Sequence, residues 1–177
     1  AILGTAITAV PPAVVTGQQI RAGRRSNPRA VQIYGEAGSL QNRKLYGLAA
    51  AEWQRLLKAF PDDPLARKAQ FHLGICLVQQ KQYSAAAASF ELTVTRHEPL
   101  ENIGEAYFQL GWCLYKVAAQ RQDDGQAAML GKSIKSFTAG ITRYPEGLFA
   151  DDALFFRGEA YYRLGDPYAA ISSYQQL

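Results

Sequence analysis

Side chains that could carry out chemistry are few in this sequence, and they are scattered. The two histidines, His72 and His97, stand 25 positions apart, without the cluster of cysteine or carboxylate ligands that a zinc site needs. The motifs Gly-x-Ser-x-Gly, Gly-x-x-x-x-Gly-Lys and His-Glu-x-x-His are missing from the sequence. The sequence therefore predicts a protein that is not an enzyme and holds neither a metal nor a cofactor.

Three pairs of adjacent aspartates are the remaining candidates for acid–base chemistry. They are Asp62–Asp63, Asp123–Asp124 and Asp151–Asp152. Each pair falls in an expected turn or at an expected helix start, where carboxylates accept hydrogen bonds from free backbone N–H groups and complement the helix dipole. We interpret the three pairs as helix caps.

The composition and the distribution of charge indicate the class of protein to which these side chains belong. The chain has 177 residues, 48% of them hydrophobic and 19% charged, which is typical of a folded globular protein and not of a disordered one. Of the net charge of +4, the segment 1–40 carries +3. This charge comes from Arg21, Arg24, Arg25 and Arg29, set against Glu36. The pattern argues against a nucleic-acid surface over the whole body, although a contact of the basic arm with a polyanion stays open.

Residues 1–27 are expected to form a leader. Its segment 1–20 carries no charge, and Pro11 and Pro12 interrupt any continuous helix, which excludes a transmembrane span. Two interpretations stay open, the remnant of a secretory signal peptide and an extended leader, because small residues recur but no positively charged start precedes them. Ser26 or Asn27 is expected to open the first helix, with Pro28 at its first position.

Residues 28–177 are expected to be entirely helical. Apolar residues recur three and four positions apart, and a strand-like alternation is not sustained anywhere. Turn-forming residues divide the region into helices of roughly one to two dozen residues. They are Pro61 and Pro64, Pro99, Asp123–Gly125, Pro145 with Gly147, and Gly165–Pro167. The sequence stops at Leu177 within an expected helix, so we take the array to be truncated at this end.

The helices repeat along the chain. Three segments, AQFHLGICL, AYFQLGWCL and ALFFRGEAYY, place Gly74, Gly111 and Gly158 in register. After the first and third of these glycines, an alanine and then an aromatic residue follow at the same spacings, as Ala86 and Phe90 do after Gly74. The spacing between that alanine and that ring recurs in residues 46–53 and indicates an earlier second helix.

This arrangement of small and aromatic residues resembles the tetratricopeptide repeat, a helix–turn–helix unit of about 34 residues. Within that family, the proline and alanine spacing of Phe60–Ala69, echoed at Tyr144–Ala153, resembles a periplasmic subgroup. That subgroup includes the outer-membrane barrel-assembly lipoprotein and the Tol-Pal coordinator protein. The resemblance covers residues 28–177 and implies an all-α, right-handed superhelix of about three and a half helix pairs.

Two departures from the repeat lead to local expectations. Ten more residues separate Gly111 from Phe137 than separate Gly74 from Phe90, so an extended loop is expected around residues 118–127. The first repeat has Gly35 and Gly38 displaced from the expected glycine position.

The two cysteines, Cys76 and Cys113, each follow a repeat glycine by two residues and so occupy equivalent positions. Equivalent positions on stacked helices are roughly 10 Å apart, whereas bridged cysteines need Cα atoms within about 7 Å. We expect two small core residues and no disulfide between them.

The resemblance also implies a concave groove lined by the first helix of each repeat. At its groove positions stands a largely aromatic stripe flanked by charges, which we expect to bind a protein or peptide because the array has other residues for its core. We call these residues the groove set. Its stripe is Phe71, Ile75, Val78, Phe108, Trp112, Tyr115, Phe155, Glu159 and Tyr162, and its flanking charges are Lys68, Glu105, Lys116, Asp152 and Arg163.

The sequence thus predicts a non-catalytic interaction scaffold that works in the assembly or maintenance of the cell envelope. The resemblance implies a periplasmic or envelope location, with a cytoplasmic location as the alternative. A second function stays open, the helical recognition or accessory domain of a larger enzyme. No small-molecule substrate is expected, and membrane contact is expected only through the leader or through segments outside this sequence.

Overall fold

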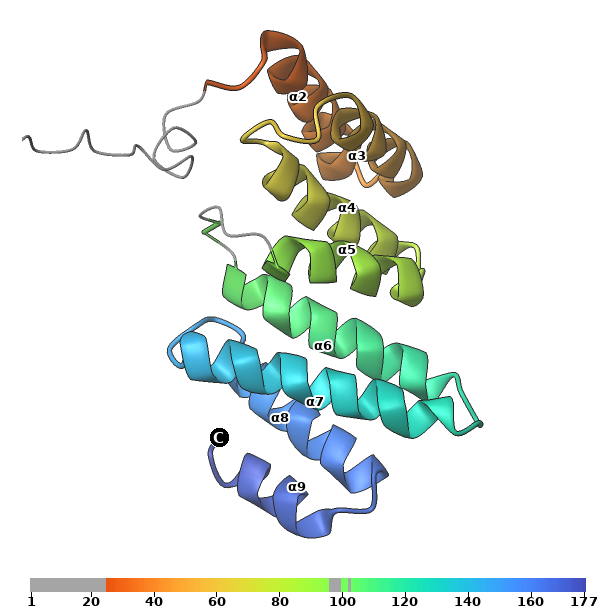
Figure 1. Ribbon diagram of the computed structural model, residues 1–177, viewed down its shortest axis with the longest axis vertical. Coiled ribbons are helices and arrows are strands. Elements are labelled where there is room, and N and C mark those ends of the chain that lie inside the picture. The colour runs from red at the N-terminus through yellow and green to blue at the C-terminus, as the bar shows by residue number, and fades with distance from the viewer. Residues whose placement is uncertain (1–24, 96–99, 102) are drawn as a thin grey trace, which may run out of the picture.

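Helices stacked one on another make up the described part of the chain. The computed structural model describes residues 25–95, 100–101 and 103–177, and within these it has eight α-helices and no strand. Each helix contacts the next, so the stack follows one long axis (Figure 1). In order the helices are α2 (Pro28–Asn42), α3 (Tyr46–Ala59), α4 (Ala66–Gln79), α5 (Tyr83–Thr95), α6 (Ile103–Ala119), α7 (Gly125–Arg143), α8 (Ala150–Arg163) and α9 (Pro167–Tyr174).

The first helix begins where the sequence predicted. Pro28 takes the first helical position, where a missing N–H leaves no helix hydrogen bond unmade, and the Asn27 side chain accepts a hydrogen bond from Arg29 N at 2.9 Å. Asp63 ties this start to the next helix pair, because its Oδ2 accepts from Asn27 N at 2.8 Å and its Oδ1 from Leu65 N at 2.9 Å. The expected leader lies outside the described residues as far as residue 24.

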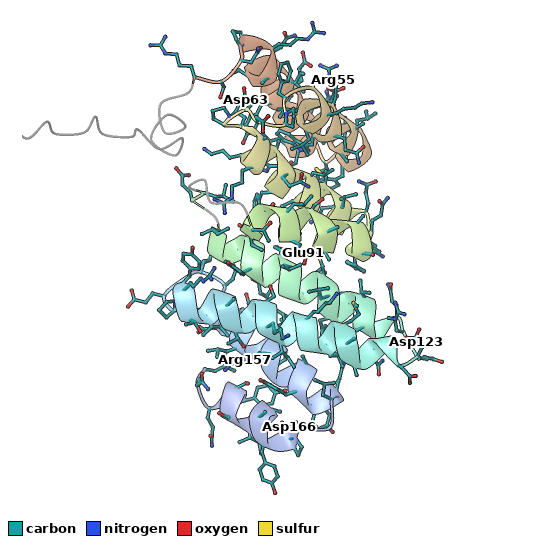
Figure 2. The ribbon with its side chains drawn as sticks, viewed as in Figure 1. Arg55, Asp63, Glu91, Asp123, Arg157 and Asp166 are labelled. Carbon is teal, nitrogen blue, oxygen red and sulfur yellow. The ribbon has the colours of Figure 1, made fainter. Side chains whose placement is uncertain are left out.

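The aspartate pairs lie at the connections between helices, as Figure 2 shows for Asp63 and Asp123. Asp123 Oδ1 accepts a hydrogen bond from Gly125 N at 3.2 Å, at the start of α7. Asp124 stands at the cap position of the same helix without a side-chain cap, and Asp151–Asp152 lie in the first turn of α8. Asp123 therefore caps the first N–H of α7, whereas Asp63 holds the turn before α4, a helix without a side-chain cap. Helix α8 has its acidic pair where the helix dipole favours it.

Neighbouring helices form four hairpins, α2–α3, α4–α5, α6–α7 and α8–α9, half a pair more than the sequence predicted. The first hairpin is complete because Ala37 takes the place of the repeat glycine: it is fully buried and precedes Ala49 by the spacing found between glycine and alanine in the next hairpin. Gly35 and Gly38 have no such role, since a Cβ added to either would meet nothing within 4 Å. The displaced glycines therefore do not mark a weakened repeat.

In the other three hairpins, a glycine of the first helix faces an aromatic ring of the second. The pairs are Gly74 with Phe90, Gly111 with Phe137, and Gly158 with Tyr174. A Cβ added to any of these glycines would lie less than 3.0 Å from the ring, a separation that real carbon atoms do not show. The two helices of each hairpin therefore approach closely at the three glycines that the sequence places in register.

The expected long loop around residues 118–127 is wrong, because most of the ten extra residues extend helices. Relative to the α4–α5 hairpin, three of them lengthen the end of α6, five lengthen the start of α7, and two enlarge the connection, which spans residues 120–124. Ala118 is buried as part of α6. The residues added to the two helices include alanine, glutamine and methionine, which favour helix.

We expect Gly111→Leu to lower the free energy of unfolding by about 1–3 kcal/mol, because the new side chain would collide with the Phe137 ring. The matched control is Gly35→Leu at an open helical position, where the better helix propensity of leucine is expected to add up to about 1 kcal/mol. Urea unfolding followed by circular dichroism measures both changes. Equal effects of the two substitutions would contradict the close packing at Gly111.

Candidate partner-binding site

The groove set is spread over one helix of each of the last three hairpins. Helix α6 is central among these, since it packs between α5 and α7 and also contacts α8. Helix α4 carries Lys68, Phe71, Ile75 and Val78; α6 carries Glu105, Phe108, Trp112, Tyr115 and Lys116; α8 carries Asp152, Phe155, Glu159, Tyr162 and Arg163. Of these three helices, α6 and α8 contact each other.

Two members of the stripe are core residues and not exposed surface. Phe71 is 4% exposed and its ring meets Phe90 edge-on at 5.8 Å, and Tyr115 is 6% exposed and meets Phe156 edge-on at 5.7 Å. Phe71 and Tyr115 are therefore not available as exposed members of the stripe. Phe71 packs within its own hairpin, against a ring of α5, whereas Tyr115 packs sideways against a ring of α8.

A cluster around Trp112 occupies the middle of α6. The half-buried Trp112 ring meets Tyr83, the first residue of α5, edge-on with ring centroids 5.4 Å apart. Lys116 Nζ lies 5.6 Å from the Trp112 ring centroid and 5.7 Å from that of Tyr83. We call these three residues the Trp112 cluster. Tyr83 was missed from the sequence because it belongs to a second helix, which the groove pattern does not include.

Helix α8 exposes the largest aromatic area of the groove set. Phe155 is 45% exposed and Tyr162 is 68% exposed. Glu159 lies between them in sequence and accepts a hydrogen bond from the Tyr174 hydroxyl at 2.7 Å. Arg163 stands over the Tyr115 ring at 4.4 Å and partly covers it. Glu159 and Arg163 are thus already engaged within the chain, whereas Phe155 and Tyr162 face outward.

The aliphatic and the remaining charged members of the groove set differ in how far they are buried. Ile75 and Val78 are half-buried and pack against the core shared by α2 to α6. Lys68 and Asp152 are exposed, each in the first turn of its helix. Among these four, only the charged pair stands clear for an outside partner.

A pocket of about 200 Å³ opens where the start of α6, the end of α7 and the start of α8 meet. Phe108 forms one wall and stacks on Phe149 at 5.1 Å with an interplanar angle of 12°. Glu105 also lines the pocket, and burial raises the pKa of this carboxyl while a hydrogen bond from Gln109 lowers it in part. We call this space the α6–α8 pocket.

The wall residues Tyr144, Leu148 and Phe149 of this pocket were missed from the sequence. They lie between α7 and α8 or directly at the helix end, next to the proline turn at residue 145. The groove positions of the repeat are counted on the first helices only. The signal that could have found them is the apolar Leu148–Phe149 pair inside an otherwise turn-forming segment.

A smaller polar pocket of about 120 Å³ lies near the start of α4, lined by Lys68, Phe71 and His72 together with Tyr34, Leu100 and Glu101. The imidazole of His72 stacks on Trp53 at 5.1 Å, and the amide of Gln41 lies 3.4 Å from its Nδ1. Burial, and secondarily the positive charge of Lys68, lower the pKa of His72. Stacking and a lowered pKa favour a neutral ring that takes part in packing.

Reactive chemistry finds little support in the described residues. They contain no group of three or more histidine, cysteine or acidic side chains that could hold a metal ion. Both cysteines are buried free thiols, which confirms them as core residues. Burial raises the pKa of Cys76 to about 11 and that of Cys113 to about 12, so neither forms a nucleophilic thiolate near neutral pH.

Comparison with models of protein families shows the family to which this chain belongs. Residues 27–174 match the model of the YfiO family, described as an outer membrane lipoprotein. The chain belongs to the YfiO family. The resemblance to the outer-membrane lipoprotein type is thereby confirmed. None of the curated proteins compared with this YfiO-family chain matches it.

Along the described stretches, no helix has the length and hydropathy needed to cross a bilayer.

Solved structures share the fold of this YfiO-family chain. MamA from Desulfovibrio magneticus RS-1, residues 41 to the end, is 20% identical with a TM-score of 0.64, over 83% of this chain and 72% of its own. YrrB, described as a TPR protein with an unusual peptide-binding site, is 23% identical with a TM-score of 0.65, over 83% and 66%. Another MamA structure is 15% identical with a TM-score of 0.65, over 90% and 81%. The likeness establishes the tetratricopeptide superhelix as the fold.

We expect Phe71→Ala to lower the free energy of unfolding by about 3–5 kcal/mol, because it would leave a cavity beside Phe90. Tyr162→Ala, at a position 68% exposed, is expected to change it by no more than about 0.5 kcal/mol. Thermal and urea unfolding of the two variants measure the difference. Similar losses at both positions would show that Tyr162 is also a packing residue.

We expect His72 to titrate below its ordinary pKa of about 6.5, because its environment favours the neutral ring. The unfolded chain then binds more protons than the folded one as the pH falls below that value, so stability decreases toward acidic pH. NMR of the imidazole Cε1–H signal follows the titration. Lys68→Gln should raise the His72 pKa, whereas Lys132→Gln on α7 should leave it unchanged. A His72 pKa at or above 6.5 would contradict the burial of the neutral ring.

Proposed function

We propose that this chain is a non-catalytic interaction scaffold that binds a protein or peptide through the first helices of its hairpins. The observation that carries the proposal is the Trp112 cluster, a partly buried indole with a lysine above it in the middle of the central helix. Tryptophan and tyrosine dominate binding hot spots, because they remove a large apolar area from water and still offer a polar atom.

The outward-facing rings of α8 add to this surface. Phe155 and Tyr162 are exposed on the helix that contacts α6, so aromatic area extends from one hairpin to the next. Membership in the YfiO family supports an interaction role, and the peptide-binding site named for YrrB supports a peptide as one form of partner.

We further propose that the partner belongs to the cell envelope and that the scaffold serves its assembly or maintenance. The support is the family, whose description is an outer membrane lipoprotein. A periplasmic location follows from the same support, with membrane contact made by parts other than the described helices. The α6–α8 pocket has about 200 Å³, less than the about 300–1,000 Å³ of sites for drug-sized ligands and cofactors, so this pocket is a poor candidate for a small-molecule site.

A larger enzyme that uses this chain as its helical recognition domain is the second candidate function. In that case the same first-helix surface would hold the substrate protein for a catalytic part elsewhere. Burial raises the pKa of both thiols, and these are the only cysteines of the chain, so the catalytic part would not use a cysteine of this chain as its nucleophile. Partner identity separates the two functions, because a scaffold retains its partner unchanged whereas a recognition domain retains one that the full-length protein modifies.

We expect Trp112→Ala to weaken partner binding by about 30-fold or more, equivalent to about 2 kcal/mol. The immobilised chain captures proteins from an envelope extract, and the affinity of each captured protein is then measured by calorimetry. The control is Leu92→Ala, which removes a 54% exposed side chain from a second helix. Both variants should keep the helical circular dichroism spectrum. If every captured protein binds the Trp112 variant as tightly as the control, the proposed surface is wrong.

A further inference from the structure

The α6–α8 pocket combines an apolar wall with negative charge. Its ionisable carboxylates are Glu101 and Glu105, and no lysine, arginine or histidine belongs to its lining. Within the described part of the chain, neither glutamate takes part in a salt bridge. The aromatic stack of Phe108 on Phe149 stands beside these carboxylates. A cation that also carries apolar surface would complement both features.

Helix ends near the pocket do not neutralise this charge. Each helix end contributes about half an elementary charge, positive at the N-terminus and negative at the C-terminus. Two N-termini, those of α6 and α8, and the C-terminus of α7 meet at the pocket. Their sum is about +0.5, against two carboxylates. The α6 dipole therefore stabilises the charge of Glu105 in the first turn of the helix, but it does not cancel the negative charge of the pocket as a whole.

Small residues shape the space. Gly104, Gly140, Ala150 and Ala153 line the pocket, and a Cβ at Gly104 would reach to 3.4 Å from Tyr144. A larger residue at Gly104 would therefore extend toward the Tyr144 wall of the pocket. The remaining volume of about 200 Å³ suits one long side chain and not a whole cofactor.

We propose that the α6–α8 pocket binds an arginine side chain of the partner protein, with the guanidinium at Glu105 and the methylene groups against the Phe108–Phe149 stack. Arginine fits better than lysine because its planar guanidinium both forks onto a carboxylate and stacks on an aromatic face. Glu101, at the exposed rim, adds negative charge along the approach. This inference deepens the proposed function and rests on it only for the existence of a partner.

The test uses Nα-acetyl-arginine amide as the probe, titrated into the ¹⁵N-labelled chain and followed by amide NMR. We expect saturable shifts at Gly104, Gly140 and Gly147, with a dissociation constant of about 1 mM for a probe of about 15 non-hydrogen atoms. Glu105→Gln should weaken binding at least about fivefold, and the matched control Glu91→Gln, at an exposed position of α5, should not. The citrulline analogue, neutral and of the same shape, should bind at least about fivefold more weakly.

Equal binding of arginine and citrulline, an unaltered affinity in Glu105→Gln, or shifts confined to other residues would each overturn the proposal. If Glu105→Gln proves unstable by circular dichroism, Glu101→Gln at the rim gives the same comparison in a folded chain, with a weaker arginine affinity expected. Tighter binding of Nα-acetyl-lysine amide, whose ε-ammonium is free, than of the arginine probe would overturn the preference for a guanidinium. None of these outcomes depends on capture of partners through Trp112, so the failure of this inference and of the proposed function are distinguishable.

Discussion

The contact between an aromatic ring and a bare stretch of helix backbone sets the spacing on which the other features of this chain depend. In the last three hairpins a glycine removes the side chain that would hold the helices apart, and a ring of the second helix occupies the space. The uncovered backbone has a further use in the α6–α7 hairpin, where Ser133 Oγ donates a hydrogen bond of 2.7 Å to the Gly111 carbonyl. In the first hairpin, Ala37 and the larger ring of Trp53 take the corresponding positions and are buried in the same core, and the Trp53 N–H donates a hydrogen bond of 3.0 Å to Gln41 Oε1.

With this spacing fixed, the surface of the first helices divides into two chemically different regions. Around the middle and end of α6, lysine and arginine stand over aromatic rings, so positive charge is held close to apolar area. At the start of α6, carboxylates stand beside aromatic rings and no cation balances them within the lining. A partner that lies along this helix therefore meets opposite signs of charge at its two ends, which fixes its direction more than its affinity.

Much of the fold followed from the sequence because its determinants recur at fixed distances. The glycine and ring spacing predicted the hairpins and the buried thiols, and Asn27 with Pro28 predicted where the helices begin. The site was less predictable. A groove position specifies the direction of a side chain within one hairpin, but the burial of Phe71 and Tyr115 depends on rings supplied by other helices, Phe90 and Phe156. The α6–α8 pocket depends on a connecting turn, whose path has no periodic signal. The extra residues of the third hairpin were predicted as a loop for a related reason. A sequence shows how long an insertion is, but not whether it forms a loop or extends the neighbouring helices.

The lengthened α6–α7 hairpin gives the stack an uneven profile. Three residues added to α6 and five added to α7, at a rise of about 1.5 Å each, carry their shared end about 5–8 Å beyond the level of the neighbouring hairpins. Figure 1 shows this end standing out at the side of the stack. Arg121 and Asp123 form two hydrogen bonds of 2.8 Å at its tip. A flat protein surface that approached from this side would therefore meet this tip before it reached the adjacent helix ends.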